Sequence, residues 1–332
     1  MTPQRVVVSG GTGFIGTSLC RLLTEQGIAF LILDRAHSPE YSDRHRKVDI
    51  RELEALRQVV EGDCLIHLAA VHRDDVRPRS LYDDVNVKGT ENLCQVAEEK
   101  GIERIIFASS VAVYGFAPPD TGEDGSINPF NDYGRTKYAA EQVLRAWQAK
   151  APARRMLTII RPTVVFGPGN RGNVYNLLRQ LQSGSFVMVG NGQNSKSMAY
   201  VENVAAFFAH ALNFGPGVHL YNYVDKPDYT MNDLVRLVRK TLKGKDDVGP
   251  RLPLAVGLTL GRLADLAAWL TGRTLPVSHI RVKKFTSTTS FSSAAHAVAG
   301  FKAPATLDQG LLATLNSEFL SPNEQARVFF TE

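Results

Sequence analysis

A tyrosine and a lysine four residues apart are the side chains whose spacing most suggests chemistry. Tyr133 and Lys137 belong to the segment Tyr-Gly-Arg-Thr-Lys, and a spacing of four places two side chains on one face of a helix. A free phenol titrates near about 10, so Tyr133 needs help to exchange protons at neutral pH. The ammonium group of Lys137 would favour the phenolate and lower its pKa. The pair therefore predicts acid–base chemistry, provided that a hydroxyl group and a redox cofactor lie beside it.

A glycine-rich segment near the N-terminus indicates the cofactor. Residues 5–9 form an apolar run typical of a buried parallel strand, and the sequence Gly-Gly-Thr-Gly-Phe-Ile-Gly follows at 10–16, before a helical pattern. Glycines at such a turn let backbone N–H groups approach a pyrophosphate at the helix N-terminus. The strand before and the helix after are the context that this motif requires. The expected cofactor contacts in this loop are Gly10, Gly13, Phe14, Ile15 and Gly16.

Further cofactor contacts are predicted at the ends of later strands. The strand at 29–33 ends at Asp34, about 20 residues beyond the glycine loop, where an acidic residue receives ribose hydroxyls. Its carboxylate would repel a 2′-phosphate, which favours NAD over NADP, although Arg35 leaves some tolerance for NADP. The other expected contacts are Asp49 and Ile50 at the adenine, the small-residue turn Leu68, Ala69 and Ala70, and Pro162.

The alternation of strands and helices predicts an α/β fold. We expect a Rossmann-type doubly wound parallel sheet with a smaller C-terminal α/β substrate-binding lobe. Residues 1–162 would form the NAD-binding domain, residues 198–222 would return to it, and residues 163–332 would mainly form the substrate-binding lobe.

Composition excludes several classes of protein. The chain has 332 residues, 44% apolar residues and a net charge of +5 without a long basic run, which indicates an anionic small-molecule ligand and no nucleic acid. The eight histidines show no metal-ligand spacing, so no metal is expected. Cys20, Cys64 and Cys94 are isolated and predict buried, reduced thiols. Because the first residues lead directly into a strand, no signal peptide and a cytoplasmic location are expected.

The most apolar late segment runs from Leu252 to Leu270. Pro253, Arg262 and Asp265 interrupt it, whereas crossing a bilayer takes about 20 uninterrupted apolar residues. We therefore expect an amphipathic helix packed on the protein, and no membrane insertion.

The order and spacing of these motifs resemble the extended short-chain dehydrogenase/reductase family, particularly its NAD-dependent nucleotide-sugar epimerase/dehydratase branch. The resemblance covers residues 5 to about 205 and weakens beyond them. It is carried by the glycine loop, Asp34, the segment 67–70, Asn86, the segment 109–115, the Tyr133/Lys137 pair and the segment 161–169.

The resemblance implies a role for each residue of a catalytic trio. Ser110 would hold the sugar oxygen, Tyr133 would exchange its proton, and Lys137 would hold the nicotinamide ribose and lower the pKa of Tyr133. Asn173 and Arg281 would lie along the diphosphate of a nucleotide-sugar substrate, because a doubly charged diphosphate needs charge-assisted donors. His72, on the loop after a strand, is either a substrate contact or part of a solvated charge run. A homodimer through the helices at 80–100 and 130–150 is also implied.

One departure from the family narrows the reaction. Dehydratases of the branch carry an Asp-Glu pair after the hydroxyl residue, whereas this chain has Val111 and Ala112, which cannot transfer protons. No cysteine stands beside the trio, which disfavours 3,5-epimerisation.

Three functions remain after these exclusions. The favoured one is an NAD-dependent 4-epimerase of a UDP-hexose or UDP-N-acetylhexosamine in polysaccharide biosynthesis, acting by transient oxidation at C4. Asp34 favours the epimerase, because it selects NAD over NADP. An epimerase regenerates its NAD in each cycle, so NAD can stay bound. The alternatives are a 4-keto nucleotide-sugar reductase or other alcohol dehydrogenase, and a non-catalytic dinucleotide sensor.

Overall fold

A parallel sheet forms the centre of the larger lobe. The computed structural model describes residues 3, 5–73, 75–271, 278–322 and 327–331, without the side chain of Arg281, and within them the sheet has seven strands. The strand order is β10-β6-β5-β4-β1-β2-β3, and every neighbouring pair is parallel. The order reverses between β1 and β4, where doubly wound sheets place their ligands. The strands are β1 (Arg5–Ser9), β2 (Ala29–Asp34), β3 (His45–Lys47), β4 (Cys64–His67), β5 (Arg104–Ala108), β6 (Met156–Pro162) and β10 (Gly217–Tyr223). The predicted fold class is confirmed.

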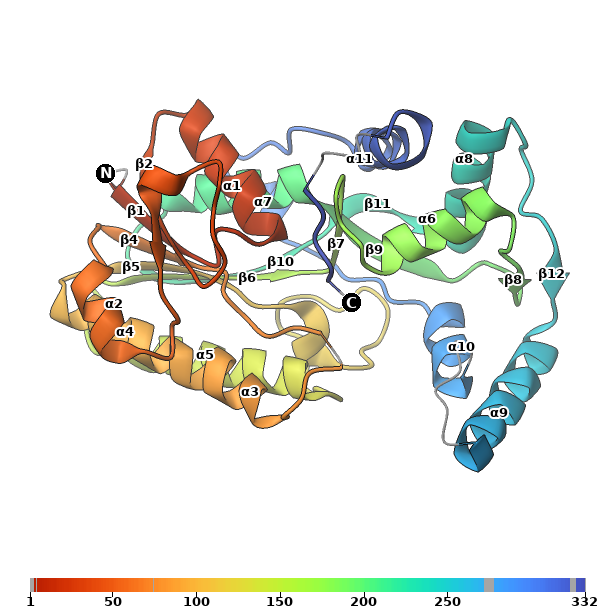
Figure 1. Ribbon diagram of the computed structural model, residues 1–332, viewed down its shortest axis with the longest axis horizontal. Coiled ribbons are helices and arrows are strands. Elements are labelled where there is room, and N and C mark those ends of the chain that lie inside the picture. Colours follow the sequence, from red (N-terminus) through yellow and green to blue (C-terminus); the bar gives the residue numbers. More distant parts are fainter. Residues whose placement is uncertain (1–2, 4, 74, 272–277, 323–326, 332) are drawn as a thin grey trace.

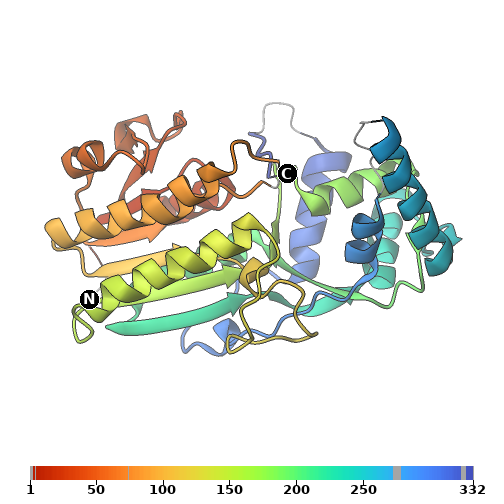
Figure 2. The same cartoon turned by 90° about the horizontal axis from the view of Figure 1, so that it is seen from below.

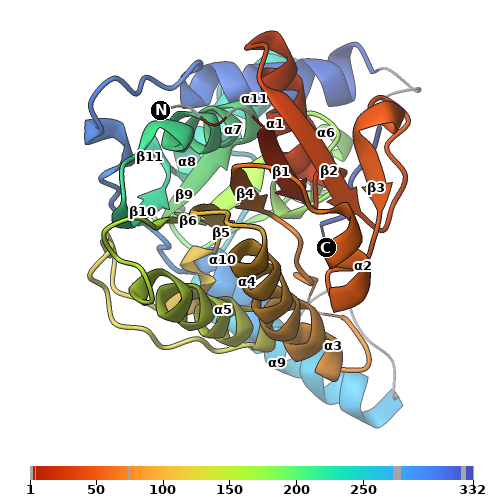
Figure 3. The ribbon, with the colours of Figure 1, turned by 90° about the vertical axis from the view of Figure 1, so that its left-hand side faces the viewer.

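Helices cover both faces of this sheet (Figures 1 and 3). One face carries α1 (Phe14–Glu25) and α7 (Val201–His210), which contact each other. The other face carries α2 (Leu53–Val59), α4 (Gly89–Glu99) and α5 (Asp132–Ala149). Short helical segments lie at η1 (Ser42–Arg44), η3 (Val111–Tyr114), η4 (Ala211–Asn213) and η5 (Ala295–Ala297).

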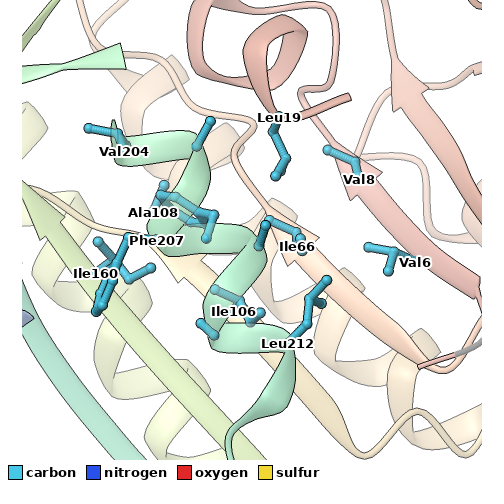
Figure 4. Packing of buried hydrophobic residues seen from close by; sticks show 14 of the residues in the cluster. Val6, Val8, Leu19, Ile66, Ile106, Ala108, Ile160, Val204, Phe207 and Leu212 are labelled. Atoms are coloured by element: carbon cyan, nitrogen blue, oxygen red, sulfur yellow. The ribbon is translucent and has the colours of Figure 1, made fainter. Parts of the chain in front are cut away.

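The core under α7 shows how the second half of the chain joins the first. Val204 and Phe207 of α7 and Leu212 of η4 pack on apolar side chains of four central strands and of α1 (Figure 4). These strand and helix residues are Val6, Val8, Leu19, Ile66, Ile106, Ala108 and Ile160. Burying a side chain such as Phe207 contributes roughly 1.5–3 kcal/mol. The larger lobe therefore includes α7 and β10 from the segment 198–222, while the exact domain boundaries stay a prediction.

The smaller lobe contains two short sheets. Among the described residues, β7 (Val164–Phe166), β9 (Ser195–Tyr200) and β11 (Asp225–Thr230) form a three-stranded sheet in the order β11-β9-β7, and β8 (Met188–Val189) pairs with β12 (Arg251–Leu252). Helices α6 (Asn173–Ser183), α8 (Met231–Lys243) and α11 (Leu307–Leu315), followed by η6 (Asn316–Leu320), share a second apolar core with this sheet.

The helix predicted over residues 80–100 has a wider turn in its middle. It consists of α3 (Ser80–Tyr82), the π-helical segment η2 (Asp83–Lys88) and α4. Asn86, in η2, accepts a hydrogen bond from the N–H of Val71 (2.8 Å) and donates to the carbonyl of Val71 (2.9 Å) and to Oγ1 of Thr136 (3.0 Å). Single-turn π segments often accompany functional sites. Here the segment connects the loop after β4 to α5, beside Lys137.

The expectation for the segment 252–270 is only half right. Helix α9 (Leu254–Thr271) is present and is followed by α10 (His279–Thr286), at the lower right of Figure 1 and again at the right edge of Figure 2. The helix contacts the protein as expected, but only one side of it is packed: the buried residues of α9 are Gly257 and Gly261, while most of its large apolar side chains are exposed. The glycines allow close contact with the protein on one side, and Leu260, Leu263, Leu266 and Leu270 lie on the other.

Candidate active site

A cavity of about 690 Å³ lies at the carboxyl ends of the central strands, within the size range of small-molecule sites. Every predicted cofactor residue lines it: Gly10, Gly13, Phe14, Ile15, Gly16, Asp34, Asp49, Ile50, Leu68, Ala69, Ala70, Tyr133, Lys137 and Pro162. Of the predicted substrate residues, Ser110, His72 and Asn173 also line it. The side chain of Arg281 lies outside the described part of the chain. The structure thus brings these residues together, while their individual roles remain predictions.

The glycine loop has the shape that a dinucleotide requires. Gly10 has a positive φ of 74°, and a Cβ atom there would lie 2.5 Å from the backbone nitrogen of Ala69. A Cβ atom at Gly16 would lie 2.4 Å from the carbonyl oxygen of Gly10. Side chains at these positions would force the loop away from the end of β4 and the start of α1. The first N–H groups of α1 border the cavity and suit the pyrophosphate of NAD.

Two carboxylates on neighbouring segments have different partners. Oδ2 of Asp34 accepts from the N–H of Thr12 (3.1 Å), and its Oδ1 accepts from the N–H of Ala36 (3.0 Å), which fixes the carboxylate at the cavity wall. Asp49 accepts two bonds from the guanidinium of Arg51 (3.0 and 2.7 Å), which hold its pKa below the ordinary value. Nε of Arg35 lies 3.5 Å from Oδ2 of Asp49. Arg35 therefore already has an anionic partner, which weakens its case as a 2′-phosphate ligand.

Ser110 and Tyr133 meet where η3 touches the first turn of α5. Both residues line the cavity, the Ser110 hydroxyl influences the pKa of Tyr133, and Oγ of Ser110 accepts a hydrogen bond from the N–H of Ala112 (3.1 Å). Asn131 caps α5 by accepting from the N–H of Gly134 (2.9 Å). A Cβ atom at Gly134 would lie only 2.3 Å from the carbonyl oxygen of Ala112. The glycine after Tyr133 is thus what allows the helix to approach the serine loop.

Burial dominates the electrostatics of the tyrosine and the lysine. It raises the pKa of Tyr133 to about 12, against an opposing effect of the Ser110 hydroxyl. Burial also lowers the pKa of Lys137 to about 7, although Glu141 opposes that shift, and Nζ of Lys137 lies 4.5 Å from the ring centroid of Phe107. The expected lowering of the Tyr133 pKa by Lys137 is therefore wrong for this structure. The loss of hydration destabilises the phenolate of Tyr133 more than the neighbouring groups stabilise it.

The two histidines at the end of β4 have different environments. His67 is buried between Oγ of Ser9 (2.7 Å) and Oγ1 of Thr90 (3.0 Å), and burial lowers its pKa to about 3. It is a neutral packing residue. His72 lines the cavity, and burial lowers its pKa as well.

A buried ionic network beneath the serine loop was missed from the sequence. Arg161 donates to both carboxylate oxygens of Glu141 (2.8 and 2.5 Å), and Ser109, next to Ser110, donates to the same carboxylate (2.5 Å). Arg161 also donates to the hydroxyl of Tyr114 (2.7 Å), which donates to Asn222 on β10 (2.8 Å). Nothing in the local pattern distinguishes Glu141 from a solvated helix residue, so only the fold reveals this network.

The walls of the cavity include distant residues that no motif indicates. On the smaller-lobe side they are Asn170, Ser197, Thr289, Phe291 and Thr331. The segment 327–331 reaches the glycine loop, where Nη2 of Arg327 donates to the carbonyl of Thr12 (2.9 Å) and the rings of Phe329 and Phe14 lie 5.6 Å apart. More than 300 residues separate Arg327 from Thr12, so sequence periodicity carries no sign of this contact.

The fold and the cavity are those of a dinucleotide-dependent enzyme, and comparison with known proteins identifies the family. Residues 6–223 match the model of the NAD dependent epimerase/dehydratase family, and the chain belongs to it. It is 47% identical, over 99% of each chain, to the N-acetyl-α-D-glucosaminyl-diphospho-ditrans,octacis-undecaprenol 4-epimerase of Escherichia coli O157:H7. It is 28% identical to the UDP-glucose 4-epimerase of Vibrio cholerae, over 97% of this chain and 98% of the relative.

Solved structures give the same result. MoeE5 in complex with UDP-glucose and NAD is 26% identical and superposes with a TM-score of 0.71, covering 96% of this chain and 99% of that one. Together the comparisons confirm the predicted family, the enzyme class and the NAD cofactor, and they agree with the predicted 4-epimerase function.

Proposed function

We propose that the protein is an NAD-dependent 4-epimerase of an N-acetylhexosamine that is joined through a diphosphate to a polyprenol. The observation that carries the reaction type is that Ser110, Tyr133 and Lys137 line one cavity together with the glycine loop. The 47% identity over both whole chains supports the carrier, because that relative is named for a lipid-linked sugar. The proposal keeps the chemistry predicted from the sequence and replaces the UDP carrier.

The side chains divide the reaction between them. When bound, NAD supplies a reversible hydride acceptor for the sugar carbon. Ser110 holds the C4 oxygen by a hydrogen bond, and Tyr133 removes the hydroxyl proton and later returns it. The return step needs a protonated Tyr133, which burial favours, whereas the influence of the Ser110 hydroxyl on the pKa of Tyr133 favours the phenolate that the forward step needs. Lys137, with a pKa of about 7, can change its charge near neutral pH.

The substrate side of the cavity suits a diphosphate and excludes dehydration. The start of α6, at Gly172 and Asn173, lines the cavity, and a helix N-terminus attracts phosphate groups. We propose Asn173 and His72 as substrate contacts on this basis. Val111 and Ala112 line the cavity beside Ser110 and offer no group that can remove a C5 proton.

A UDP-sugar 4-epimerase is the second candidate, favoured by the Vibrio cholerae relative and by MoeE5 with its bound UDP-glucose. The test is to incubate the purified protein with detergent-solubilised polyprenyl-diphospho-N-acetylglucosamine, and separately with UDP-N-acetylglucosamine and UDP-glucose, with and without added NAD. Released sugars are then separated by chromatography, with Tyr133→Phe as the inactive control. We expect N-acetylgalactosamine from the lipid-linked substrate without net change in NADH. Conversion of UDP-sugars alone would select the second candidate, and stoichiometric formation of NADH from the added NAD would refute both.

The quaternary structure and location are also proposals. We propose a cytoplasmic homodimer formed through the helices at 80–100 and 130–150, acting in polysaccharide biosynthesis. The support is the family resemblance and the position of α4 and α5 side by side on one outer face of the large sheet (Figure 2). Light scattering of the purified protein tests the dimer, and a monomeric mass at micromolar concentration would refute it.

A further inference from the structure

Helix α9 exposes an unusual row of large apolar side chains. Within the described residues it is the helix that is long and apolar enough, by length and composition, to cross a membrane. Leu263 is 56% exposed and Trp269 is 77% exposed. The exposed large apolar residues of the helix are Leu254, Val256, Leu260, Leu263, Leu266, Trp269 and Leu270. Single exposed leucines are common on soluble proteins, whereas a continuous apolar surface indicates an interaction site.

The two sides of α9 have different tasks. Gly257, Gly261 and Asp265 are spaced by four residues on one side of the helix, where the two glycines are buried against the protein. Gly257 packs against Val189, Gly261 packs against the backbone of His279, and Asp265 accepts a hydrogen bond from the N–H of His279 (3.0 Å). The apolar residues at positions 256, 260, 263 and 270 follow the spacing of a single helix face, on the opposite side. Leu260, Leu263, Leu266 and Leu270 therefore point away from the protein.

The connections of α9 favour a position along a membrane surface over a passage through it. The helix is about 27 Å long at 1.5 Å per residue, and Arg262 lies in its middle. Its N-terminal end follows β12, which pairs with β8, and α10 packs back on it. Nζ of Lys196 on β9 donates to the carbonyls of Lys284 (2.9 Å) and Ser287 (2.6 Å), which holds the end of α10 against the smaller lobe. Both ends of α9 thus stay on the protein side.

Positive charge accompanies the apolar row. Helix α10 carries Lys283 and Lys284 in its last turn, and its Ile280 is exposed. Arg262 is exposed on α9. Apolar side chains flanked by lysine and arginine are the composition with which interfacial helices bind anionic lipid headgroups.

The same surface continues to the catalytic cavity. Nζ of Lys284 lies 4.8 Å from the ring centroid of Phe130, and Phe130 stacks on Phe116 with centroids 4.8 Å apart. Both rings are about half exposed. Gly115, next to Phe116, and Thr289, just after α10, line the cavity.

We propose that α9, with α10 and the Phe116–Phe130 pair, docks the protein on an anionic phospholipid bilayer. Docked in this way, the protein would receive a sugar diphosphate in its cavity while the attached polyprenol stays in the membrane. This inference rests on the proposed lipid-linked substrate. It revises the expectation of no membrane insertion to shallow insertion of one helix face.

The two tryptophans give a direct test with the unmodified protein. Trp147 is 2% exposed in the core, and Trp269 is 77% exposed on α9. Adding phosphatidylglycerol-containing vesicles should therefore shift the emission of Trp269 to shorter wavelength, whereas Trp147 supplies a constant background. Trp269→Phe should abolish the shift. Phosphatidylcholine vesicles should produce a smaller shift, because they lack the charge that attracts α10. An unchanged wild-type spectrum with both vesicle types would overturn the proposal.

Vesicle flotation measures the contribution of the apolar face. Leu263→Glu combined with Leu266→Glu should reduce vesicle binding about a hundredfold, since each half-exposed leucine contributes roughly tenfold when its methylenes enter the interface. Leu312→Glu is the matched control, because Leu312 is 43% exposed on α11, away from this surface, and should leave binding unchanged. Equal binding by both variants would contradict the proposal.

Measurements of enzyme activity and of molecular mass in solution distinguish membrane docking from failure of the proposed function and from dimerisation through α9. With a short-chain substrate in detergent and no vesicles, the double variant should turn over within about twofold of wild type. An inactive wild-type protein that still binds vesicles through α9 would refute the proposed function and leave the docking surface intact. The proposal would be overturned if the wild-type protein failed to bind vesicles and formed a dimer that the double substitution disrupts. The apolar face of α9 would then be the contact with a second copy of the chain.

Discussion

Replacing Lys137 by methionine should remove a pH dependence of folding stability. Burial lowers the pKa of Lys137 from 10.5 to about 7, so between these values the unfolded chain binds the proton and the folded chain releases it. Stability then rises with pH in this window, by up to about 1.36 kcal/mol per pH unit. From pH 7 to pH 9 the gain is roughly 2 kcal/mol, allowing for half-protonation at pH 7. Lys137→Met keeps the length of the side chain and loses the titration.

The assay is urea unfolding of cofactor-stripped protein at pH 7, 8 and 9 at constant ionic strength. The variant should be the more stable protein at pH 7, with an advantage that shrinks by roughly 2 kcal/mol by pH 9. The buried tyrosines and thiols are present in both proteins, so their effects cancel in the difference. Lys240→Met, at an exposed lysine of α8, is the control and should run parallel to wild type. Parallel curves for Lys137→Met and wild type would refute the claim that this ammonium is desolvated.

Three further predictions concern catalysis, the cofactor and the buried network. Tyr133→Phe should lower turnover about 10²- to 10⁴-fold with NAD binding intact, and Ser110→Ala should lose less because the proton path remains; a kinetically ordinary Tyr133→Phe enzyme would refute the assignment. In equilibrium titrations NAD should bind more tightly than NADP, and Asp34→Ala should reduce that preference about tenfold; an unchanged ratio would show that Asp34 does not select the cofactor. Glu141→Gln should destabilise the fold by about 3–5 kcal/mol in urea unfolding, because it leaves Arg161 buried without its counter-charge; a stability within 1 kcal/mol of wild type would contradict the importance of that ion pair.

Local patterns were sufficient for the parts of the site that belong to continuous segments. The glycine loop, Asp34 at the end of β2, and the Tyr133–Lys137 spacing each depend on a few neighbouring residues, whose backbone geometry follows directly from residue type. The alternation of apolar runs also predicted the parallel sheet, because the burial of both sheet faces leaves a clear trace in the sequence. For the same reason the cavity could be anticipated at the carboxyl ends of the strands.

Only the tertiary structure decided the electrostatics and the long-range contacts. The pKa values of Tyr133 and Lys137 depend on how much water the fold excludes, and the sequence indicated the opposite direction for Tyr133. The contact of Arg327 with Thr12 arises from packing between segments with no sequence relation. Helix α9 shows the same limit, since its apolar periodicity predicts an apolar face but not what that face meets. A hydrophobic pattern in the sequence indicates that one face of a helix is buried away from water. Whether that face packs in the protein core or contacts a lipid surface depends on which elements the fold places beside the helix.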